Sequence, residues 1–254
     1  MIITVTNQKG GVAKTTTAAA LLSYYQEQGK KALAIDLDPQ CNFSLITGAE
    51  MSGRSILGVL TGQANTADTI QHTPNGDIIA GSEALSAADS LLNNTGKEYR
   101  LREALEQIAG QYERIVIDSP PALGVLSVNA LTAADTVIIP CAADLLSIQS
   151  LKQLENTISV VKKYCNPNLS IAGILLTRHN GRTLLSRDFQ SILEQEAAAM
   201  STKVFETAIR ESVAIRQAQA MQKSIFTQQG GAVDDYKAFI EEFEKGERNH
   251  EQKA

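Results

Sequence analysis

One short segment near the start of the chain limits the possible folds more than any other. It is Asn7–Thr16, with the sequence NQKGGVAKTT, and it lies between an apolar run, Ile2–Thr6, and a helical pattern, Lys14–Gln28. Glycines at such a strand-to-helix turn let several backbone N–H groups converge on phosphate oxygens. The N-terminus of the following helix adds partial positive charge. This context predicts a phosphate-binding loop that opens a βαβ unit.

The side chains of this loop suit a nucleoside triphosphate with a magnesium ion. We expect Lys14 to reach the β- and γ-phosphates and the hydroxyl of Thr15 to ligate Mg²⁺. The standard pattern G-x-x-x-x-G-K-[ST] is not met, because Gln8 and Ala13 stand at its glycine positions, and the loop reads K-G-G-x-x-K-T instead. Ala13 must therefore adopt a backbone conformation that an L-residue tolerates. The predicted nucleotide contacts in the loop are Lys9, Gly10, Gly11, Val12, Ala13, Lys14, Thr15 and Thr16.

The rest of the chain alternates short apolar runs with helical patterns. Several runs are continuously hydrophobic, which is typical of strands buried on both faces of a parallel sheet. We therefore predict an α/β fold with one doubly wound, mostly parallel sheet and helices on both faces. We expect a single domain over residues 1–254, with a frayed tail at 246–254.

The expected strands are Ile2–Thr6, Ala32–Ile35, Asp77–Ala80, Arg114–Ile117, Thr136–Ile139, Ile171–Leu176 and Lys203–Phe205. The expected helices are Lys14–Gln28, Lys97–Ala109, Ser147–Tyr164, Leu184–Met200, Ser212–Gln222 and Ala232–Lys245. Residues 48–76 are the least regular part of the sequence, and we expect small helices or a mobile loop there.

Aspartates follow two of the predicted strands at their C-terminal ends, where doubly wound sheets bind their ligands. Asp36 and Asp38 belong to a DLDPQ segment, and Asp118 ends the run IVID, which continues into Ser-Pro-Pro. A carboxylate that emerges at the end of such a buried strand can act on Mg²⁺ or on its bound water. The two segments and the loop together predict one site at one edge of the sheet.

These motifs recur in an order that resembles the ParA/MinD family of deviant Walker P-loop ATPases, over nearly the whole chain. The resemblance implies hydrolysis of ATP to ADP and phosphate, slow and stimulated by a partner protein. It implies that Lys9 reaches across a dimer interface to the other subunit's nucleotide, which couples dimerisation to ATP binding. It also implies that Asp38 orients the attacking water. The predicted catalytic residues are thus Lys9, Lys14 and Asp38, and the predicted metal-site residues are Thr15, Asp36 and Asp118.

The base and DNA sites are placed in the C-terminal third. The sequence contains no Asn-Lys-x-Asp element that would read guanine, so adenine is favoured. From Arg178 to Lys223, seven cations stand against five anions, a modest excess of two. In relatives these segments carry non-specific DNA contacts, which read backbone charge and weaken with salt. The predicted adenine-site residues are Thr177, Arg178, Ile209 and Arg210, and the predicted DNA-binding residues are Arg182, Arg210 and Arg216.

The resemblance is to the short ParA form, without an N-terminal helix-turn-helix. It implies a homodimer with ATP, non-specific DNA and a ParB-like centromere-binding protein as partners in plasmid or chromosome partitioning. The alternative is a MinD-like or other ParA-like positioning ATPase that acts on a membrane or a protein cargo. We expect no membrane binding, because the last helical segment, FIEEFEKGE, has an acidic polar face that anionic lipid repels.

Composition agrees with this picture. The net charge of −5 excludes a generally basic nucleic-acid coat but leaves room for a local basic patch. The three cysteines, Cys41, Cys141 and Cys165, have no metal-ligand spacing, which disfavours an iron–sulfur electron carrier. Cysteines of this kind fit a reducing cytoplasm. We therefore expect a cytoplasmic protein that associates with the nucleoid when ATP is bound.

Overall fold

A computed structural model of the chain describes residues 1–179 and 185–251. Within these residues, eight strands form one sheet in the order β3-β4-β2-β5-β1-β6-β7-β8. Neighbouring strands are parallel except β3 and β4, which are antiparallel. This confirms the predicted mostly parallel α/β sheet. The strands are β1 (Ile2–Val5), β2 (Ala32–Asp36), β3 (Gln71–Thr73), β4 (Gly76–Ile79), β5 (Arg114–Asp118), β6 (Thr136–Ala142), β7 (Ser170–His179) and β8 (Ile209–Arg210).

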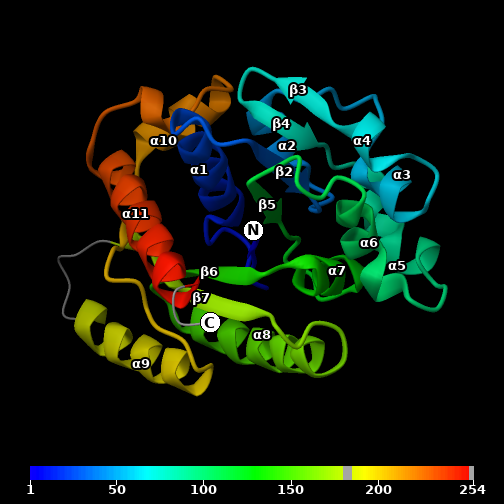
Figure 1. Cartoon of the computed structure of the whole chain (residues 1–254). Coiled ribbons are helices and arrows are strands. Elements are labelled where there is room, and N and C mark those ends of the chain that lie inside the picture. The colour runs from blue at the N-terminus through cyan, green and yellow to red at the C-terminus, as the bar shows by residue number, and fades with distance from the viewer. Residues whose placement is uncertain (180–184, 252–254) are drawn as a thin grey trace.

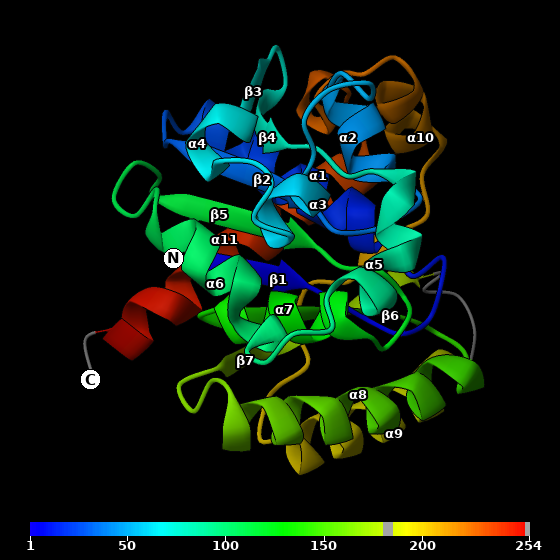
Figure 2. The same ribbon diagram turned by 90° about the vertical axis from the view of Figure 1, so that its right-hand side faces the viewer.

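Helices cover both faces of the sheet (Figures 1 and 2). On one face of the sheet, α1, α2, α10 and α11 pack against the strands in one hydrophobic cluster. On the other face, α3, α5, α6, α7, α8 and α9 pack against the strands in two further clusters. The helices are α1 (Lys14–Glu27), α2 (Asn42–Thr47), α3 (Ile56–Leu60), α4 (Thr66–Thr69), α5 (Ala88–Leu91), α6 (Arg100–Glu106), α7 (Val125–Ala133), α8 (Leu145–Tyr164), α9 (Leu185–Ala199), α10 (Val213–Ala220) and α11 (Gly231–Glu251). Short 3₁₀ turns lie at Glu83–Ala87, Lys97–Tyr99 and Ile225–Thr227.

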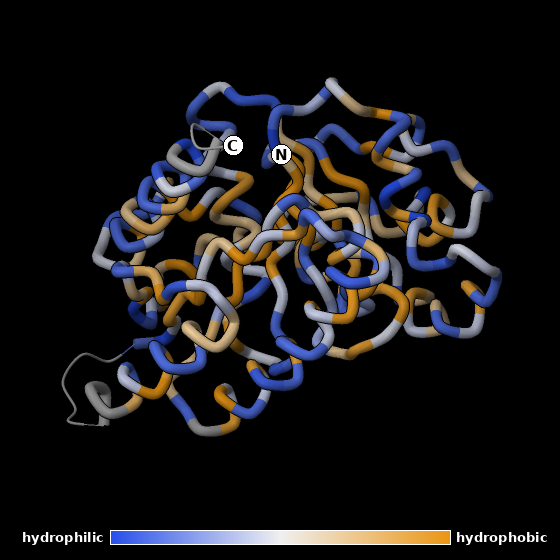
Figure 3. Tube along the Cα trace, turned by 60° about the horizontal axis from the view of Figure 1, so that its bottom comes forward, coloured by the Kyte–Doolittle hydropathy of each residue, from blue (hydrophilic) through white to orange (hydrophobic). Residues whose placement is uncertain are grey.

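Hydrophobic segments gather in the central strands, and polar segments lie on the outer surfaces of the helices (Figure 3). The central strands β2, β5 and β6 are buried almost throughout, as their continuous apolar runs predict. On α11, Phe239, Ile240 and Phe243 are at most 1% exposed. Burial of each such side chain stabilises the fold by about 1.5–3 kcal/mol.

The structure corrects two predictions from the sequence. Lys203–Phe205 is not a strand, because only Val204 pairs with the sheet, through Ile174. The next backbone N–H groups, of Glu206 and Thr207, donate to the Glu242 carboxylate on α11 at 2.9 and 3.1 Å, which leads the chain away from the sheet. Of the tail predicted to fray over residues 246–254, residues 246–251 are helical and end α11, whereas 252–254 lie outside the described residues.

Other elements were not predicted from the sequence. Helix α7 is buried against two hydrophobic clusters, so its sequence lacks the polar stripe by which an amphipathic helix is recognised. Strand β3 pairs with β4 in a hairpin across a two-residue turn. The irregular region 48–76 holds the short helices α3 and α4, as expected.

A buried ion cluster ties α11 to the sheet and to α1. The Glu244 carboxylate accepts hydrogen bonds from Tyr25 Oη at 2.8 Å and Lys30 Nζ at 3.0 Å. It also accepts two from the Arg114 guanidinium, both at 3.1 Å. Burial alone would raise the pKa of Glu244, but the hydrogen bonds from Arg114, Lys30 and Tyr25 lower that pKa to about 2.

We predict that Glu244→Gln lowers the free energy of unfolding by about 2–3 kcal/mol at neutral pH, because two cations lose a buried carboxylate. Stability from a carboxyl with a depressed pKa is present above its ordinary value of 4.5 and is lost as the pH falls toward 2. The difference in free energy of unfolding between wild type and variant, measured by urea unfolding, should therefore become smaller below about pH 4.5. Glu241→Gln, an exposed change on the same helix, should cost less than about 0.5 kcal/mol. Equal losses for the two variants would contradict the role of the cluster.

Candidate functional site

Hydrogen bonds anchor the loop between β1 and α1 to the strands β6 and β7. Asn7 donates from Nδ2 to the Pro140 carbonyl at 2.7 Å, and its Oδ1 accepts from the Lys9 N–H at 3.0 Å. On the other side, Thr177 Oγ1 donates to the Val12 carbonyl at 3.1 Å. These bonds hold the backbone of the loop at the C-terminal edge of the sheet, where phosphate-binding loops lie.

Two positions of this loop have left-handed backbone conformations. Gly11 has a φ of 76°, which glycine adopts freely. Ala13 has a φ of 68° and a ψ of 30°, in the left-handed region that costs an L-residue about 1–2 kcal/mol. This is a conformation that an L-residue tolerates, as predicted for Ala13, but at the cost of strain.

Two buried carboxylates lie side by side at the ends of β2 and β5. The parallel register pairs Asp36 with Asp118, and both are 0% exposed. Thr15 Oγ1 donates to Asp118 Oδ2 at 2.6 Å, whereas Asp118 Oδ1 is buried without a partner among the described residues. An unpartnered buried carboxylate oxygen calls for a cation or a bound water.

Asp36 and Asp38 shape the loop that follows β2. Asp36 Oδ2 accepts from the N–H and the hydroxyl of Ser44, at 2.8 and 2.7 Å, and Asp36 Oδ1 accepts from the Asp38 N–H at 3.1 Å. Asp38 accepts from the Gln40 N–H at 3.0 Å and lines the cavity described below. Asp36 thus braces α2 against the loop, while Asp38 faces the space in which a ligand would lie.

Burial perturbs the charges of this cluster. It raises the pKa of Asp36 to about 6. Burial and then the nearby charge of Asp36 raise the pKa of Asp118 well above its ordinary value, against the bond from Thr15 and the charge of Lys14. Burial also lowers the pKa of Lys14, although Asp118 and Asp38 oppose this shift. A cation bound here would favour the ionised carboxylates.

The donor set fits magnesium held together with phosphates. Within residues 1–179 and 185–251, no three His, Cys, Asp or Glu side chains are grouped so as to hold a metal ion by themselves. Mg²⁺ is usually bound by one or two carboxylates, waters and substrate phosphates rather than by a complete protein cage. Thr15 and the open oxygen of Asp118 are donors of this kind beside the phosphate loop.

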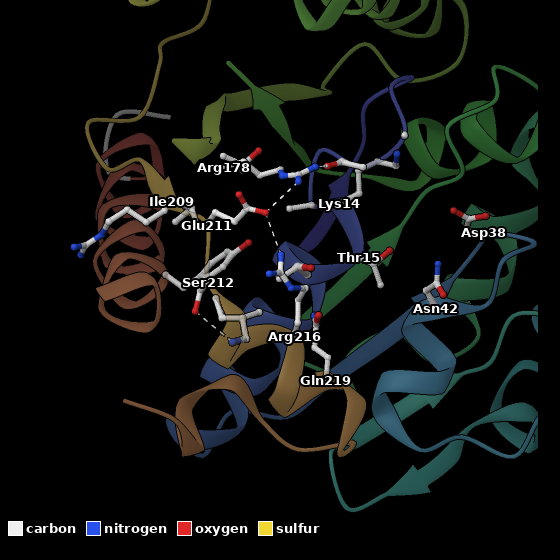
Figure 4. A pocket seen from close by; sticks show the side chains of 18 of the residues that line it. Lys14, Thr15, Asp38, Asn42, Arg178, Ile209, Glu211, Ser212, Arg216 and Gln219 are labelled. Carbon is white, nitrogen blue, oxygen red and sulfur yellow. Dashed lines mark hydrogen bonds and ion pairs between the residues drawn. The ribbon is translucent and has the colours of Figure 1, made fainter. Parts of the chain in front are cut away.

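A cavity of about 470 Å³ opens over the phosphate loop (Figure 4). Twelve predicted site residues line it, namely Gly10, Gly11, Ala13, Lys14, Thr15, Thr16, Asp38, Thr177, Arg178, Ile209, Arg210 and Arg216. Lys9, Val12, Asp36 and Asp118 are not among its lining residues. The sequence analysis did not select several others that line it, including Gln40, Asn42, Glu211, Ser212, Gln219 and Tyr236.

Glu211 organises two arginines at the cavity (Figure 4). Its Oε1 accepts from Arg178 Nη2 at 3.1 Å and from Arg216 Nη1 at 3.0 Å. Arg178 also donates to the Gly11 carbonyl at 3.3 Å, so it connects the phosphate loop to the segment before α10. Arg216, selected as a DNA contact, therefore lies at the nucleotide cavity.

Arg210, also selected for DNA binding, lines the cavity too but is paired with α11. Arg210 donates from Nε and Nη2 to the Asp235 carboxylate on α11, at 2.8 and 2.7 Å. Most of its hydrogen-bonding capacity is directed at that helix. Arg182 lies outside the described residues.

Lys9 is paired within its own subunit. Its ammonium contacts the Asp144 carboxylate and donates to Ser147 Oγ at 3.2 Å, at the start of α8. The sequence analysis selected neither Asp144 nor Ser147. The only signal in the sequence was a helix N-cap, and Asp144 does cap α8 by accepting from the Ser147 N–H at 3.1 Å.

Comparisons with known proteins identify close relatives. Residues 1–171 match a family model described as an AAA domain. Sporulation initiation inhibitor protein Soj of Bacillus subtilis is 37% identical over 229 residues, which cover 88% of this chain and 89% of Soj. Chromosome partitioning protein ParA of Caulobacter vibrioides is 36% identical over 231 residues, which cover 88% of this chain and 85% of ParA.

Solved structures share the fold. One from Mycobacterium smegmatis, described as cobyrinic acid a,c-diamide synthase with a bound ATP analogue and magnesium, has a TM-score of 0.77 and 34% identity, covering 86% of this chain and 92% of its own. A plasmid partition protein of Borrelia burgdorferi bound to AMPPNP has a TM-score of 0.82 and 25% identity, covering 96% and 98%.

We predict that Ala13→Gly stabilises the protein by about 0.5–1 kcal/mol. Glycine relieves the left-handed strain, and its more flexible unfolded chain offsets part of that gain. Ala238→Gly, an exposed change within α11, should instead destabilise by about 1 kcal/mol. Urea unfolding measures the change in the free energy of unfolding for each variant. A loss of stability in both variants would show that Ala13 is not strained.

Proposed function

The chain belongs to the AAA-domain family of the Soj and ParA partition proteins, and on that premise we propose that it is a ParA-type partition ATPase working as a dimer closed over ATP. The observation that carries the proposal is the convergence of Lys14, Thr15 and Asp38 on one cavity at the C-terminal ends of β1, β2 and β5, with Asp118 bonded to Thr15. We propose that residues 1–254 form a single ATPase domain.

We propose ATP and Mg²⁺ as substrate and cofactor. The phosphates would lie on the backbone N–H groups of Gly10–Thr16, with Lys14 at the β- and γ-phosphates. Thr15 and Asp118 would hold Mg²⁺, with Asp36 behind them, and the metal would supply charge neutralisation at the phosphates. The relatives bound to an ATP analogue with magnesium and to AMPPNP support this choice. The amide-forming activity named for the Mycobacterium protein is not carried over, because two relatives aligned over 88% of the chain, the ParA proteins of Caulobacter vibrioides and Myxococcus xanthus, are named as chromosome partitioning proteins.

Asp38 is the best-placed group to act on the attacking water. It is 8% exposed, lines the cavity and is held by the Gln40 N–H. A fixed carboxylate in hydrogen-bond reach of a water orients it for in-line attack on the γ-phosphate.

The adenine end is proposed to lie between the ends of β7 and β8. Thr177, Arg178 and Ile209 line the cavity there. Thr177 and Arg178 also bond to the phosphate loop, so nucleotide bound at this end would contact residues that support the phosphate site. Arg210 lines the same end but is held by Asp235.

Lys9 is proposed to act on the nucleotide of a second subunit. It begins the loop but does not line the cavity of its own chain, which favours action in trans. Two exposed leucines suit burial by a second copy. Leu123, in the loop after Asp118, is 49% exposed, and Leu146, one residue before the Lys9 contact Ser147, is 67% exposed.

Non-specific DNA and a ParB-like protein are the proposed partners, and DNA binding would place the ATP-bound protein on the nucleoid. Arg182 and Arg216 are the first candidates for phosphate contacts, and Arg210 follows because it is already paired. Among the residues that the structure describes, Arg216 is paired with Glu211 at an exposed site, where an ion pair is weak and phosphate can compete.

A positioning ATPase with another cargo is the alternative. No helix in the described residues has the length and apolar character needed to cross a membrane. Of the glutamates that make the polar face of α11 acidic in the sequence, Glu244 is buried and Glu242 bonds the backbone of Glu206 and Thr207, so neither adds to an acidic surface. A protein assembly as cargo would use the same ATP cycle.

We predict that Asp38→Asn binds ATP with nearly wild-type affinity but releases phosphate at least about 100-fold more slowly, because the amide cannot take a proton from water. Fluorescent-nucleotide titration and a phosphate-release assay measure the two effects. Lys14→Ala, as the contrasting variant, should lose ATP binding itself. Wild-type turnover in Asp38→Asn would remove Asp38 from the mechanism.

We predict that Lys9→Ala still binds ATP but stays monomeric with AMPPNP and loses ATP-dependent, salt-sensitive DNA binding. Sedimentation and DNA titration at two salt concentrations measure these effects. Lys31→Ala, which removes an exposed lysine elsewhere, should behave as wild type. A Lys9→Ala dimer of normal strength would overturn the proposed role of Lys9.

A further inference from the structure

The pair between Lys9 and Asp144 occupies the ammonium that the proposed function needs elsewhere. The Lys9 side chain is 25% exposed and the Asp144 side chain 43% exposed, so the contact lies at the surface and can open. Ser147 Oγ accepts a further bond from the same ammonium. One ammonium cannot hold Asp144 and also reach the phosphates of another subunit.

Asp144 is held in place independently of Lys9. Its carboxylate caps α8 by accepting from the N–H and the hydroxyl of Ser147, at 3.1 and 3.3 Å. Partial burial alone would raise the pKa of Asp144, but the bonds from Lys9 and from the Ser147 N–H lower it below its ordinary value. The carboxylate is therefore charged at neutral pH and fixed by the helix start.

The backbone at Lys9 is also fixed. The Lys9 N–H donates to Asn7 Oδ1 at 3.0 Å, and that oxygen accepts a second bond from Ser150 Oγ at 2.9 Å. Lys14 Nζ donates to the Lys9 carbonyl at 3.0 Å. Only the flexible side chain of Lys9 must move for its ammonium to change partners.

We propose that Asp144 is a positioning residue that holds Lys9 in the single subunit, and that formation of the dimer must remove Lys9 from it. This inference rests on the proposed action of Lys9 in trans. Each closing dimer breaks two such pairs, so Asp144 raises the concentration at which subunits associate. Exposed ion pairs contribute a factor of about 1.4–5 each, and two of them multiply to about 2- to 30-fold.

The test is Asp144→Asn, measured with AMPPNP and Mg²⁺ by sedimentation equilibrium. Asparagine caps a helix as well as aspartate does, so the variant removes the charge and keeps α8 intact. We expect the dimer dissociation constant to fall by about 2- to 30-fold while the thermal midpoint of the nucleotide-free protein stays the same. Glu103→Gln, which breaks the exposed pair with Arg100 on α6, should leave dimerisation unchanged.

Two further variants, Lys9→Ala and the double variant Lys9→Ala with Asp144→Asn, distinguish failure of the inference about Asp144 from failure of the proposed action of Lys9 in trans. If Lys9→Ala dimerises normally, the proposed action in trans fails and the role of Asp144 fails with it. If Lys9→Ala stays monomeric but Asp144→Asn equals or weakens the wild-type dimer, only the inference about Asp144 is overturned. Asp144→Asn must also have no effect in the Lys9→Ala background, since an equal gain there would show that Asp144 does not act through Lys9.

Discussion

The buried pairing of Asp36 with Asp118 at adjacent strand ends is the constraint on which the rest of the site depends. Parallel register places these two carboxylates side by side without access to water. Burial and mutual repulsion both penalise their ionised forms. The chain offsets part of this penalty with hydrogen bonds from Ser44 and Thr15, and the charge of Lys14 also favours ionised Asp118. One oxygen of Asp118 stays open, so the arrangement suits a bound cation.

The cations around the cavity already have partners within the subunit. Lys14 bonds the Lys9 carbonyl, Glu211 holds two arginines, and Asp144 holds Lys9. A nucleotide or a second subunit must therefore exchange existing contacts for new ones. Such exchange makes binding and rearrangement parts of one equilibrium, which is the physical requirement for a switch.

The pattern of the sequence was sufficient wherever function depends on a local element. A glycine turn between strand and helix, and aspartates at the ends of apolar runs, are local patterns, and the structure brings them to one edge. The sequence pattern failed where contacts with segments distant in the chain determine the structure. The strand-like run 203–205 pairs with the sheet only at Val204, because α11 takes the next N–H groups. Helix α7 packs against two hydrophobic clusters, so its apolar residues are not confined to one face.

The sequence by itself determined the parallel sheet, the phosphate loop and the carboxylates at the strand ends, because each follows from residues close together in the chain. Tertiary structure alone decided the partners of the exposed charges. Lys9 meets Asp144 across 135 positions, and Arg178 meets Glu211 across 33. Contacts over such separations depend on how strands and helices pack, which the spacing of charges along the chain does not encode.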